Sequence, residues 1–248
     1  MIPSIPVNAS HHGNQYIIVI SGSDNAVLSM KFGTILRFIL STHDERGRKT
    51  SDWFRMLVRR KVRRMVSKDR GPFLDAGGGD GLLFDPNVCR LAEMTTILDT
   101  DRNALLDARK SYGNKGMFVT GDVTQMPFPD STFTTSVCIG TFINFSSVTM
   151  VQRSLIECAR VTKPDGRVIT EFRNADNPFV SLAFRHADIY DSSLDGLPLR
   201  AYSLSQIKDM ISRAGLEVRR IKIIGIPVKP LIFSYIIEAG YTSSGRTS

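Results

Sequence analysis

Residues 73–81, Phe-Leu-Asp-Ala-Gly-Gly-Gly-Asp-Gly, decide the fold of this chain. A short apolar run, Phe73-Leu74, ends in Asp75, and four glycines then fall within five residues. This pattern is typical of a buried strand that ends in a turn from which side chains are excluded. Glycine tolerates positive φ and lets another molecule approach the backbone closely. A helix that starts just beyond such a turn directs its free N–H groups at a polar ligand.

The spacing of the glycines separates two kinds of nucleotide-binding loop. The dinucleotide fingerprint G-x-G-x-x-G/A, counted from Gly77, requires a small residue at position 82, which is Leu82. The chain has instead the pattern D-x-G-x-G-x-G from Asp75 to Gly81. This pattern resembles motif I of the class I S-adenosylmethionine (SAM)-dependent methyltransferases, of the methyltransferase type 11 or UbiE-like kind. The resemblance implies that the loop passes under the amino-acid end of SAM and that Asp75 helps to hold its ammonium group. A glycine-rich surface turn without a ligand is the alternative.

Asp99 lies where a second strand of a doubly wound sheet would end beside the first. It follows the short buried run 95–98 and stands 18 residues beyond Gly81. A carboxylate there can accept hydrogen bonds from both hydroxyl groups of a ribose. The run that starts at Asp99 resembles the family's D-x-S-x-x-x-L-x-x-A, with Asp101 in place of serine. We assign ribose binding to Asp99 and helix capping to Asp101, with the reverse assignment as the alternative.

Two later stretches resemble the same family in the expected order. Gly121-Asp122-Val123 and the run MPFPDSTF at 126–133 resemble G-D-(A/V)-x-x-L-P-F-P-D-x-S-F. This resemblance implies that Asp122 hydrogen-bonds the adenine amino group and that Val123 packs on the ring. An aspartate is otherwise a common turn former, but the Pro-Phe-Pro run disfavours that reading. The run RVTKPDGR at 160–167 resembles R-V-L-K-P-G-G-x, a structural turn between a helix at 151–161 and a fifth strand at 168–172.

The resemblance covers residues 71–239 and implies SAM as the cofactor. The cofactor-binding residues that follow from it are Asp75, Ala76, Gly77, Gly79, Gly81, Asp99, Thr100, Asp122, Val123 and Ile139. The implied fold is α/β, a Rossmann-like, doubly wound sheet of seven strands in the order 3-2-1-4-5-7-6. Segments 217–226 and 231–239 are joined too closely for a parallel crossover, so they form a hairpin and the last strand is antiparallel. The first crossover helix, 82–94, contains Asp85-Pro86, which predicts that it is broken or delayed.

No residue can be assigned to catalysis from the sequence. The methyl group of a sulfonium is already activated, so alignment matters most and can supply roughly 7–11 kcal/mol of barrier reduction. A general base is needed only if the acceptor arrives protonated. The weak candidates are His186, Tyr190, Tyr202, Glu171 and Asn144.

The chain divides into three segments. Residues 1–24 are predicted to be a mobile tail with one short strand at 16–20, and Met30 is an alternative start to Met1. Residues 25–70 are predicted to be a helical cap, with helices at 26–40 and about 53–67. Residues 71–248 are predicted to be the SAM-binding domain, in which 175–202, rich in aromatic and polar residues, form a candidate substrate lid.

Positive charge is concentrated in one segment. The formal net charge is +8, and residues 55–70 hold eight basic residues against one acidic residue, a net +7. The basic residues of this segment form the solvated face of a capping helix, or they bind an anionic partner. The possible partners are the head group of the acceptor, a membrane surface and RNA. No aromatic residue follows Phe54 in it, which makes RNA stacking the weaker option.

We therefore predict a cytoplasmic methyltransferase for a small-molecule acceptor, such as a sugar, lipid-linked compound or secondary metabolite. RNA or protein methylation through the basic helix is one alternative. A non-catalytic SAM-binding protein is another, motivated by Pro86, Thr134 and Asn144. Cys89, Cys138 and Cys158 are widely spaced and read as reduced core residues, so no metal site is predicted. The apolar runs are shorter than a membrane helix needs.

Overall fold

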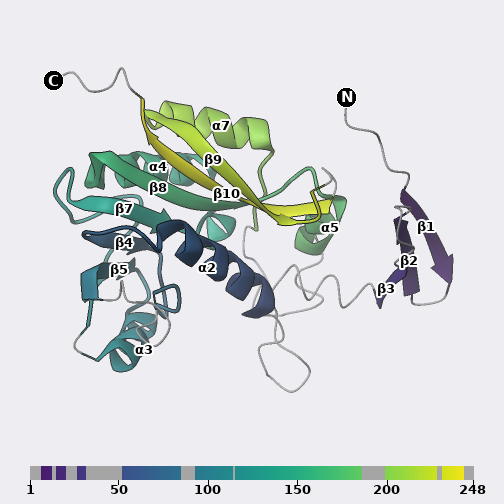
Figure 1. Cartoon of the computed structure of the whole chain (residues 1–248), viewed down its shortest axis with the longest axis horizontal. Coiled ribbons are helices and arrows are strands. Elements are labelled where there is room, and N and C mark those ends of the chain that lie inside the picture. The colour runs from purple at the N-terminus through teal and green to yellow at the C-terminus, as the bar shows by residue number, and fades with distance from the viewer. Residues whose placement is uncertain are drawn as a thin grey trace.

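The computed structural model describes residues 7–12, 15–20, 27–31, 52–84, 93–113, 115–185, 199–227 and 231–242. Its main feature is a seven-stranded sheet in the order β6-β5-β4-β7-β8-β10-β9 (Figure 1). The strands are β4 (Phe73–Ala76), β5 (Thr95–Asp99), β6 (Met117–Thr120), β7 (Phe133–Cys138), β8 (Thr162–Arg173), β9 (Leu216–Gly225) and β10 (Ile232–Tyr241). Strands β4 to β8 run parallel, and β10 is antiparallel to both of its neighbours, β8 and β9. The predicted strand order and the antiparallel last strand are confirmed.

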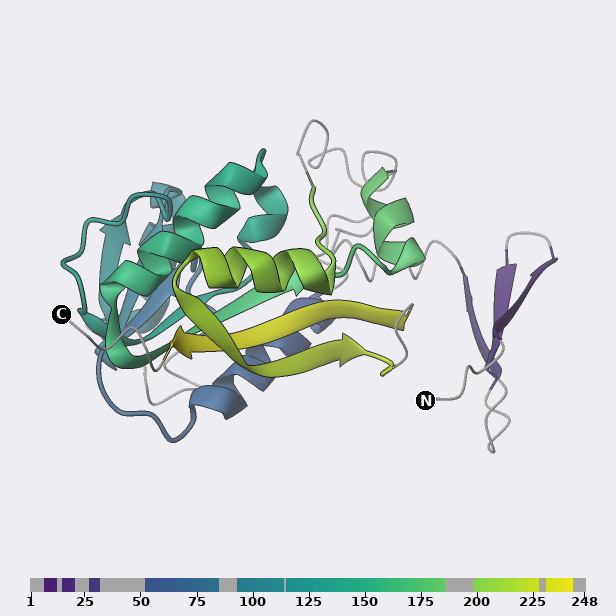
Figure 2. The same ribbon diagram turned by 90° about the horizontal axis from the view of Figure 1, so that it is seen from above.

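Helices cover both faces of this sheet (Figure 2). They are α2 (Asp52–Val66), α3 (Arg102–Tyr112), the short 3-10 helix η2 (Phe142–Asn144), α4 (Val148–Val161), α5 (Pro178–Arg185) and α7 (Leu204–Arg213). Helices α2 and α3 share one hydrophobic cluster with the sheet, and α4 and α7 share the other. Among the described helices, none is long and apolar enough to cross a bilayer.

Helix α2 lies across one face of the sheet because its apolar residues repeat every fourth position. Phe54, Val58, Val62 and Val66 have exposed fractions of 1%, 4%, 0% and 0%. They pack against β4, β8 and β10 in one cluster. Burying each such side chain is worth about 1.5–3 kcal/mol. This stripe therefore holds the basic helix in a fixed position beside the carboxyl ends of the strands.

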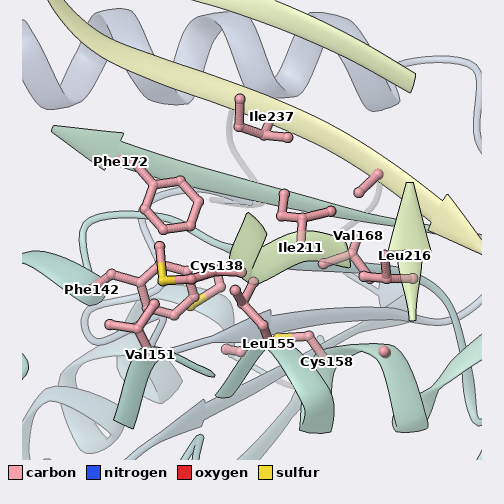
Figure 3. Packing of buried hydrophobic residues seen from close by; sticks show 14 of the residues in the cluster. Cys138, Phe142, Val151, Leu155, Cys158, Val168, Phe172, Ile211, Leu216 and Ile237 are labelled. Atoms are coloured by element: carbon pink, nitrogen blue, oxygen red, sulfur yellow. The ribbon is translucent and has the colours of Figure 1, made fainter. Parts of the chain in front are cut away.

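The opposite face is covered by α4 and α7, whose N-termini are capped by the side chains of Ser147 and Ser203. Ser203 accepts a hydrogen bond from Gln206 N, and the Gln206 side chain accepts one from Ser203 N, which completes a capping box. Figure 3 shows Leu155 and Cys158 of α4 close to Ile211 and to side chains of the sheet. Cys138 and Cys158 are both buried and unbridged.

The first part of one predicted helix is wrong. Residues 26–40 were expected to be helical, but Val27–Lys31 form strand β3, and residues 32–40 lie outside the described residues. This strand pairs with β2 (Gln15–Ile20), which also pairs with β1 (Val7–His12) in a separate antiparallel sheet. The β-branched run of β2 offers a pairing edge, and strand pairing overrides the helical spacing of a short apolar segment. Segment 7–20 thus contains two strands rather than the single one expected.

Two further segments bear on the predicted boundaries. Residues 82–84 form turns, which agrees with a crossover helix that is broken or delayed, and residues 85–92 lie outside the described residues. Strand β8 starts at Thr162 rather than at 168. Its register against β7 jumps from Phe133↔Thr162 to Thr135↔Arg167. The expected proline turn is therefore a bulge within the strand, where extra residues are accommodated without ending the pairing.

Candidate functional site

A cavity of about 530 Å³ lies at the carboxyl edge of the parallel strands. Its walls come from α2, the glycine loop after β4, the first turn of α3, the segment after β7 and the end of β8. This is where a doubly wound sheet binds its ligands, because the strand order reverses between β4 and β7. Among the residues that the sequence analysis singled out, the lining includes Asp75, Gly77, Gly79, Ile139, Asn144 and Glu171.

The glycine loop is packed so closely on its inner side that side chains are excluded. Gly77 has φ +74°, and a Cβ added there would lie 2.3 Å from Thr141 Oγ1. Gly77 N and Gly78 N donate to Leu98 O at 2.7 and 3.2 Å, which ties the loop to β5. Gly81 does not line the cavity. Its carbonyl oxygen accepts a 2.6 Å hydrogen bond from Tyr112 Oη, which ties the end of the loop to α3.

Asp75 is a buried carboxylate without a full set of partners. It is 2% exposed, it lines the cavity, and its Oδ2 has no hydrogen-bond partner among the described residues. Burial raises its pKa to about 7, against an opposing effect of Arg59 and with smaller contributions from Asp80 and Asp99. A buried carboxyl group with an open acceptor atom suits a cationic ligand.

Asp99 and Asp101 accept hydrogen bonds from different backbone N–H groups. Asp99 Oδ2 accepts from Gly79 N at 2.8 Å, and its Oδ1 accepts from Asp101 N at 2.9 Å. Asp101 Oδ1 accepts from Asn103 N and Ala104 N, at 2.8 and 3.2 Å, as the N-cap of α3. The capping prediction for Asp101 is confirmed. Asp101 lines the cavity, whereas Asp99 and Thr100 do not.

The residues predicted for adenine lie beyond this cavity. Asp122 Oδ1 accepts from Thr124 N at 2.7 Å and so shapes the turn after β6. Val123 is buried in the core cluster of α4 and α7. Neither they nor Ala76 line the cavity. The structure therefore places four of the predicted cofactor residues around one cavity, Asp75, Gly77, Gly79 and Ile139, and the other six outside its lining.

A buried ion pair forms the wall at the end of β8. Glu171 and Arg173 are 3% and 6% exposed, and Arg173 Nε lies 3.5 Å from Glu171 Oε1. Glu171 also accepts from Ser234 Oγ and, at 3.3 Å, from Gly140 N. Arg173 Cζ lies 3.7 Å from the centroid of the Phe54 ring. Burial lowers the pKa of Arg173, Glu171 raises it and Arg55 lowers it.

No role was predicted for Arg173 from the sequence, and Arg55 and Arg59 were predicted only as part of the basic segment 55–70. Arg173 follows Glu171 by two positions, which puts both side chains on one face of a strand, so the alternation could have revealed it. Arg55 and Arg59 line the cavity from α2, and Arg59 Nη2 lies 3.4 Å from Asp80 Oδ1. The sequence gives no sign of which residues of the basic helix face the strand ends.

The remaining catalytic candidates differ in whether they line the cavity. Asn144 lines the cavity from η2. Tyr202 is buried against the Phe172 ring, with centroids 5.8 Å apart, and does not line the cavity. His186 and Tyr190, and most of the predicted lid, lie outside the described residues. The described start of that segment forms α5.

Comparison with known proteins gives matches of one kind. Residues 74–170 match a family model described as "Methyltransferase domain". The ubiquinone/menaquinone biosynthesis C-methyltransferase UbiE of Hahella chejuensis is 35% identical over 143 residues, covering 54% of this chain and 53% of that protein. The UbiE of Roseobacter denitrificans is 26% identical over 179 residues, covering 69% and 66%. The chain thus spans about half to two thirds of the length of these relatives.

Solved structures share the fold at low sequence identity. Magnesium protoporphyrin IX methyltransferase from Synechocystis, solved with bound S-adenosylhomocysteine (SAH), superposes with a TM-score of 0.59 at 18% identity, over 76% of this chain and 84% of that one. A SAM-dependent methyltransferase from Thermotoga maritima superposes with a TM-score of 0.57 at 14% identity, over 85% and 93%.

Proposed function

We propose that this chain is a class I SAM-dependent methyltransferase and that it methylates a small-molecule acceptor held between α2 and the ends of β7 and β8. The observation that carries the proposal is a single cavity that joins the glycine loop to the buried Glu171–Arg173 pair. One end of this cavity suits the cofactor, and the other end is enclosed by side chains that suit a small ligand.

The residues at the glycine loop fit the amino-acid end of SAM. The open Oδ2 of Asp75 lies in the cavity wall, where it would accept a hydrogen bond from the ammonium group. At Gly79, which lines the cavity, a Cβ would meet only Asp99 Oδ2 at 3.7 Å, so glycine leaves room there for a ligand to approach the backbone. When bound, SAM supplies a methyl group on a positively charged sulfur, so the protein has mainly to hold and align the acceptor.

The ribose and adenine ends of SAM are assigned to the neighbouring strands. Each oxygen of Asp99 accepts one backbone N–H and keeps a second lone pair, with which it would accept the ribose hydroxyls beside Thr100. Asp122 and Val123 would hold the adenine ring beyond the cavity, at the end of β6. Ile139 would pack against the cofactor from the end of β7. The packing role of Gly81 in the structure and the buried position of Ala76 support indirect roles for these two residues.

The acceptor side combines apolar and polar groups. Phe54 and Ile143 offer apolar surface, and Asn144 and Glu171 offer hydrogen-bonding groups in the same cavity. The names of the two sequence relatives refer to quinone biosynthesis and to methylation at carbon. A ring carbon of a quinone-type acceptor is therefore the first candidate for methylation. Glu171 is the proposed proton acceptor if the acceptor binds in a protonated form, whereas His186 and Tyr190 remain predictions.

The test is to follow the label from SAM tritiated at the methyl group. The protein is incubated with labelled SAM and a cell extract, and radioactivity is measured in solvent-extracted small molecules and in acid-precipitated macromolecules. We expect label in the small-molecule fraction that depends on Asp75, with Asp75→Asn as the inactive variant. Asp209→Asn is the control, because Asp209 lies on the exposed side of α7 and pairs with Arg213 on the same helix.

The outcomes separate the alternatives. Label confined to the precipitate would replace the small-molecule proposal with RNA or protein methylation. If wild type and Asp75→Asn incorporate the same background in both fractions, the non-catalytic reading holds.

The basic face of α2 supports a second proposal, contact with an anionic surface. Lys61, Arg64 and Lys68 of the α2 segment form a groove with Arg220 and Lys222 of β9. Lys61 is engaged with Ile223 O at 2.7 Å, but Arg64 and Lys68 are exposed. Such a cluster attracts the anionic headgroups of a membrane, which would bring the enzyme close to a lipid-linked acceptor.

A further inference from the structure

Arg173 carries hydrogen-bond donors that the described part of the protein does not use. Its side chain is 7% exposed, and its Nε and Nη1 atoms have no hydrogen-bond partner among the described residues. A guanidinium group has five N–H donors and stays protonated. Burial of such a group without acceptors is costly, so a position of this kind calls for an acceptor supplied by something else.

The neighbours of Arg173 hold it in place without satisfying it. The Phe54 ring covers one face of the guanidinium at 3.7 Å, a cation–π contact that leaves the N–H edge free. The nearest carboxylate oxygen, Glu171 Oε1, is 3.5 Å from Nε, which is beyond a good hydrogen bond. That carboxylate already accepts from Ser234 Oγ and Gly140 N. Because Arg173 also lines the cavity, a ligand there can reach it.

The position in the sheet assigns Arg173 to the acceptor rather than to the cofactor. The order β4-β7-β8 puts the end of β8 two strands away from the glycine loop, which is about 10 Å at the usual strand spacing. The acidic group for the cofactor's ammonium, Asp75, lies on the β4 side. The arginine near Asp75 is Arg59, which lowers the pKa of that carboxyl group and pairs with Asp80.

We propose that Arg173 binds an anionic oxygen of the acceptor, a carboxylate or an ionised ring hydroxyl, while Phe54 and Glu171 position the guanidinium. This inference rests on the proposed function, since it places a negatively charged small molecule in the acceptor end of the same cavity. A charged hydrogen bond to a buried arginine is stronger and more selective than a neutral one. The enzyme therefore discriminates acceptors by charge as well as by size.

The experiment measures the binding of simple probes to the protein saturated with SAH. The probes are benzoate, 4-nitrophenolate and the neutral benzamide, titrated by NMR line broadening into wild type, Arg173→Gln and Arg173→Lys. Arg213→Gln is the matched control, because Arg213 is an exposed arginine on α7 that pairs with Asp209. The affinity of each protein for SAH is measured first.

We expect unchanged SAH binding in all four proteins and at least tenfold weaker binding of one or both anionic probes to Arg173→Gln. Arg173→Lys keeps the charge and recovers part of that affinity, whereas benzamide binds all four proteins equally. Preference for benzoate over 4-nitrophenolate identifies a carboxylate, and the opposite preference identifies a ring hydroxyl.

Three results overturn the inference. Equal binding of the anions to wild type and Arg173→Gln does so, as does the absence of saturable anion binding to wild type. A tenfold loss of SAH affinity in Arg173→Gln would show that Arg173 binds the cofactor rather than the acceptor, and it would leave the proposed function intact. If Arg173→Gln does not fold, Arg173→Lys and the ratio of benzoate to benzamide affinity in wild type decide the matter, and a ratio near one contradicts the inference. Failure of wild type to bind SAH would contradict the proposed function itself.

Discussion

At the scale of the residue, Asp75 and Arg173 line one cavity and both have hydrogen-bonding atoms without a partner among the described residues. They differ in how well their positions can be predicted from the sequence. Asp75 ends an apolar strand before a glycine loop, so its position could be predicted. Arg173 is the last residue of β8, and the sign of its position in the sequence is its spacing of two residues from Glu171. Its role depends on burial by Phe54, which comes from a distant helix.

The raised pKa of Asp75 predicts a specific pH dependence of cofactor binding. In the free protein the carboxyl group keeps its proton up to a pKa of about 7, and a bound ammonium group would favour the ionised form. Binding below pH 7 must therefore release a proton, and the dissociation constant for SAH should rise about tenfold for each pH unit below 7. Calorimetric titration between pH 5.5 and 7.5 measures this, and Asp75→Asn should show weak binding without that slope. A wild-type affinity that is flat across this range contradicts the assignment.

The same group predicts how the stability of the ligand-free protein changes with pH. Its pKa is about 3.8 when unfolded and about 7 when folded, so the folded state binds more protons between these values. The free energy of unfolding then falls as pH rises, by up to about 1.4 kcal/mol per unit for this one group. Urea unfolding of wild type and Asp75→Asn should show that the variant gains stability relative to wild type from pH 4 to 7. A constant difference would mean that Asp75 ionises normally.

At the scale of the element, the sequence predicts the parallel strands well because each is a short apolar run that ends in an acid or glycine. The hairpin of β9 and β10 follows from the short link between them. Helix α2 is predicted from its apolar stripe, but the division of its basic residues between two sites is not, because it depends on which strands lie beneath. The first part of the helix predicted at 26–40 is wrong because Val27–Lys31 pair with β2, a contact that no local pattern reveals.

Arg160, which the sequence marks only as part of a family turn, organises the loop that follows Val123. It donates to Met126 O at 3.0 Å, to Phe128 O at 2.8 Å and to Asp130 Oδ1 at 2.7 Å, and it also bonds Glu157. Arg160→Gln should destabilise the protein by about 1–3 kcal/mol, because several carbonyl oxygens lose a charged donor. Chemical unfolding measures the loss, and Arg153→Gln, on the exposed side of α4, should change stability little. Equal effects of the two substitutions would contradict this role.

At the scale of the whole molecule, the basic residues of the α2 segment line two different surfaces. Arg55 and Arg59 line the cavity, whereas Lys61, Arg64 and Lys68 join Arg220 and Lys222 in a separate groove. The groove lies where α2 passes the edge strand β9. One helix therefore contributes basic residues both to the cavity at the strand ends and to a groove on the outer surface.

The outer groove predicts salt-sensitive attachment to anionic membranes. We expect the protein to sediment with vesicles of phosphatidylcholine containing phosphatidylglycerol, and not with pure phosphatidylcholine, with attachment lost as salt is raised. The triple substitution Arg64→Gln, Lys68→Gln and Arg220→Gln should abolish sedimentation while SAH binding stays unchanged. Unaltered sedimentation of this variant, or equal sedimentation with neutral vesicles, would remove the groove as the contact surface.

We propose that the cavity at the carboxyl edge of β4 holds the amino-acid end of the cofactor at Asp75, and that Asp99, outside the lining of this cavity, holds the ribose. The most direct measurement is a crystal structure of the protein with SAH. We expect the amino nitrogen of SAH about 3 Å from Asp75 Oδ2 and the ribose hydroxyls within hydrogen-bond distance of Asp99. SAH bound at another place, or in this cavity with its amino group directed to Arg173 rather than to Asp75, would contradict it.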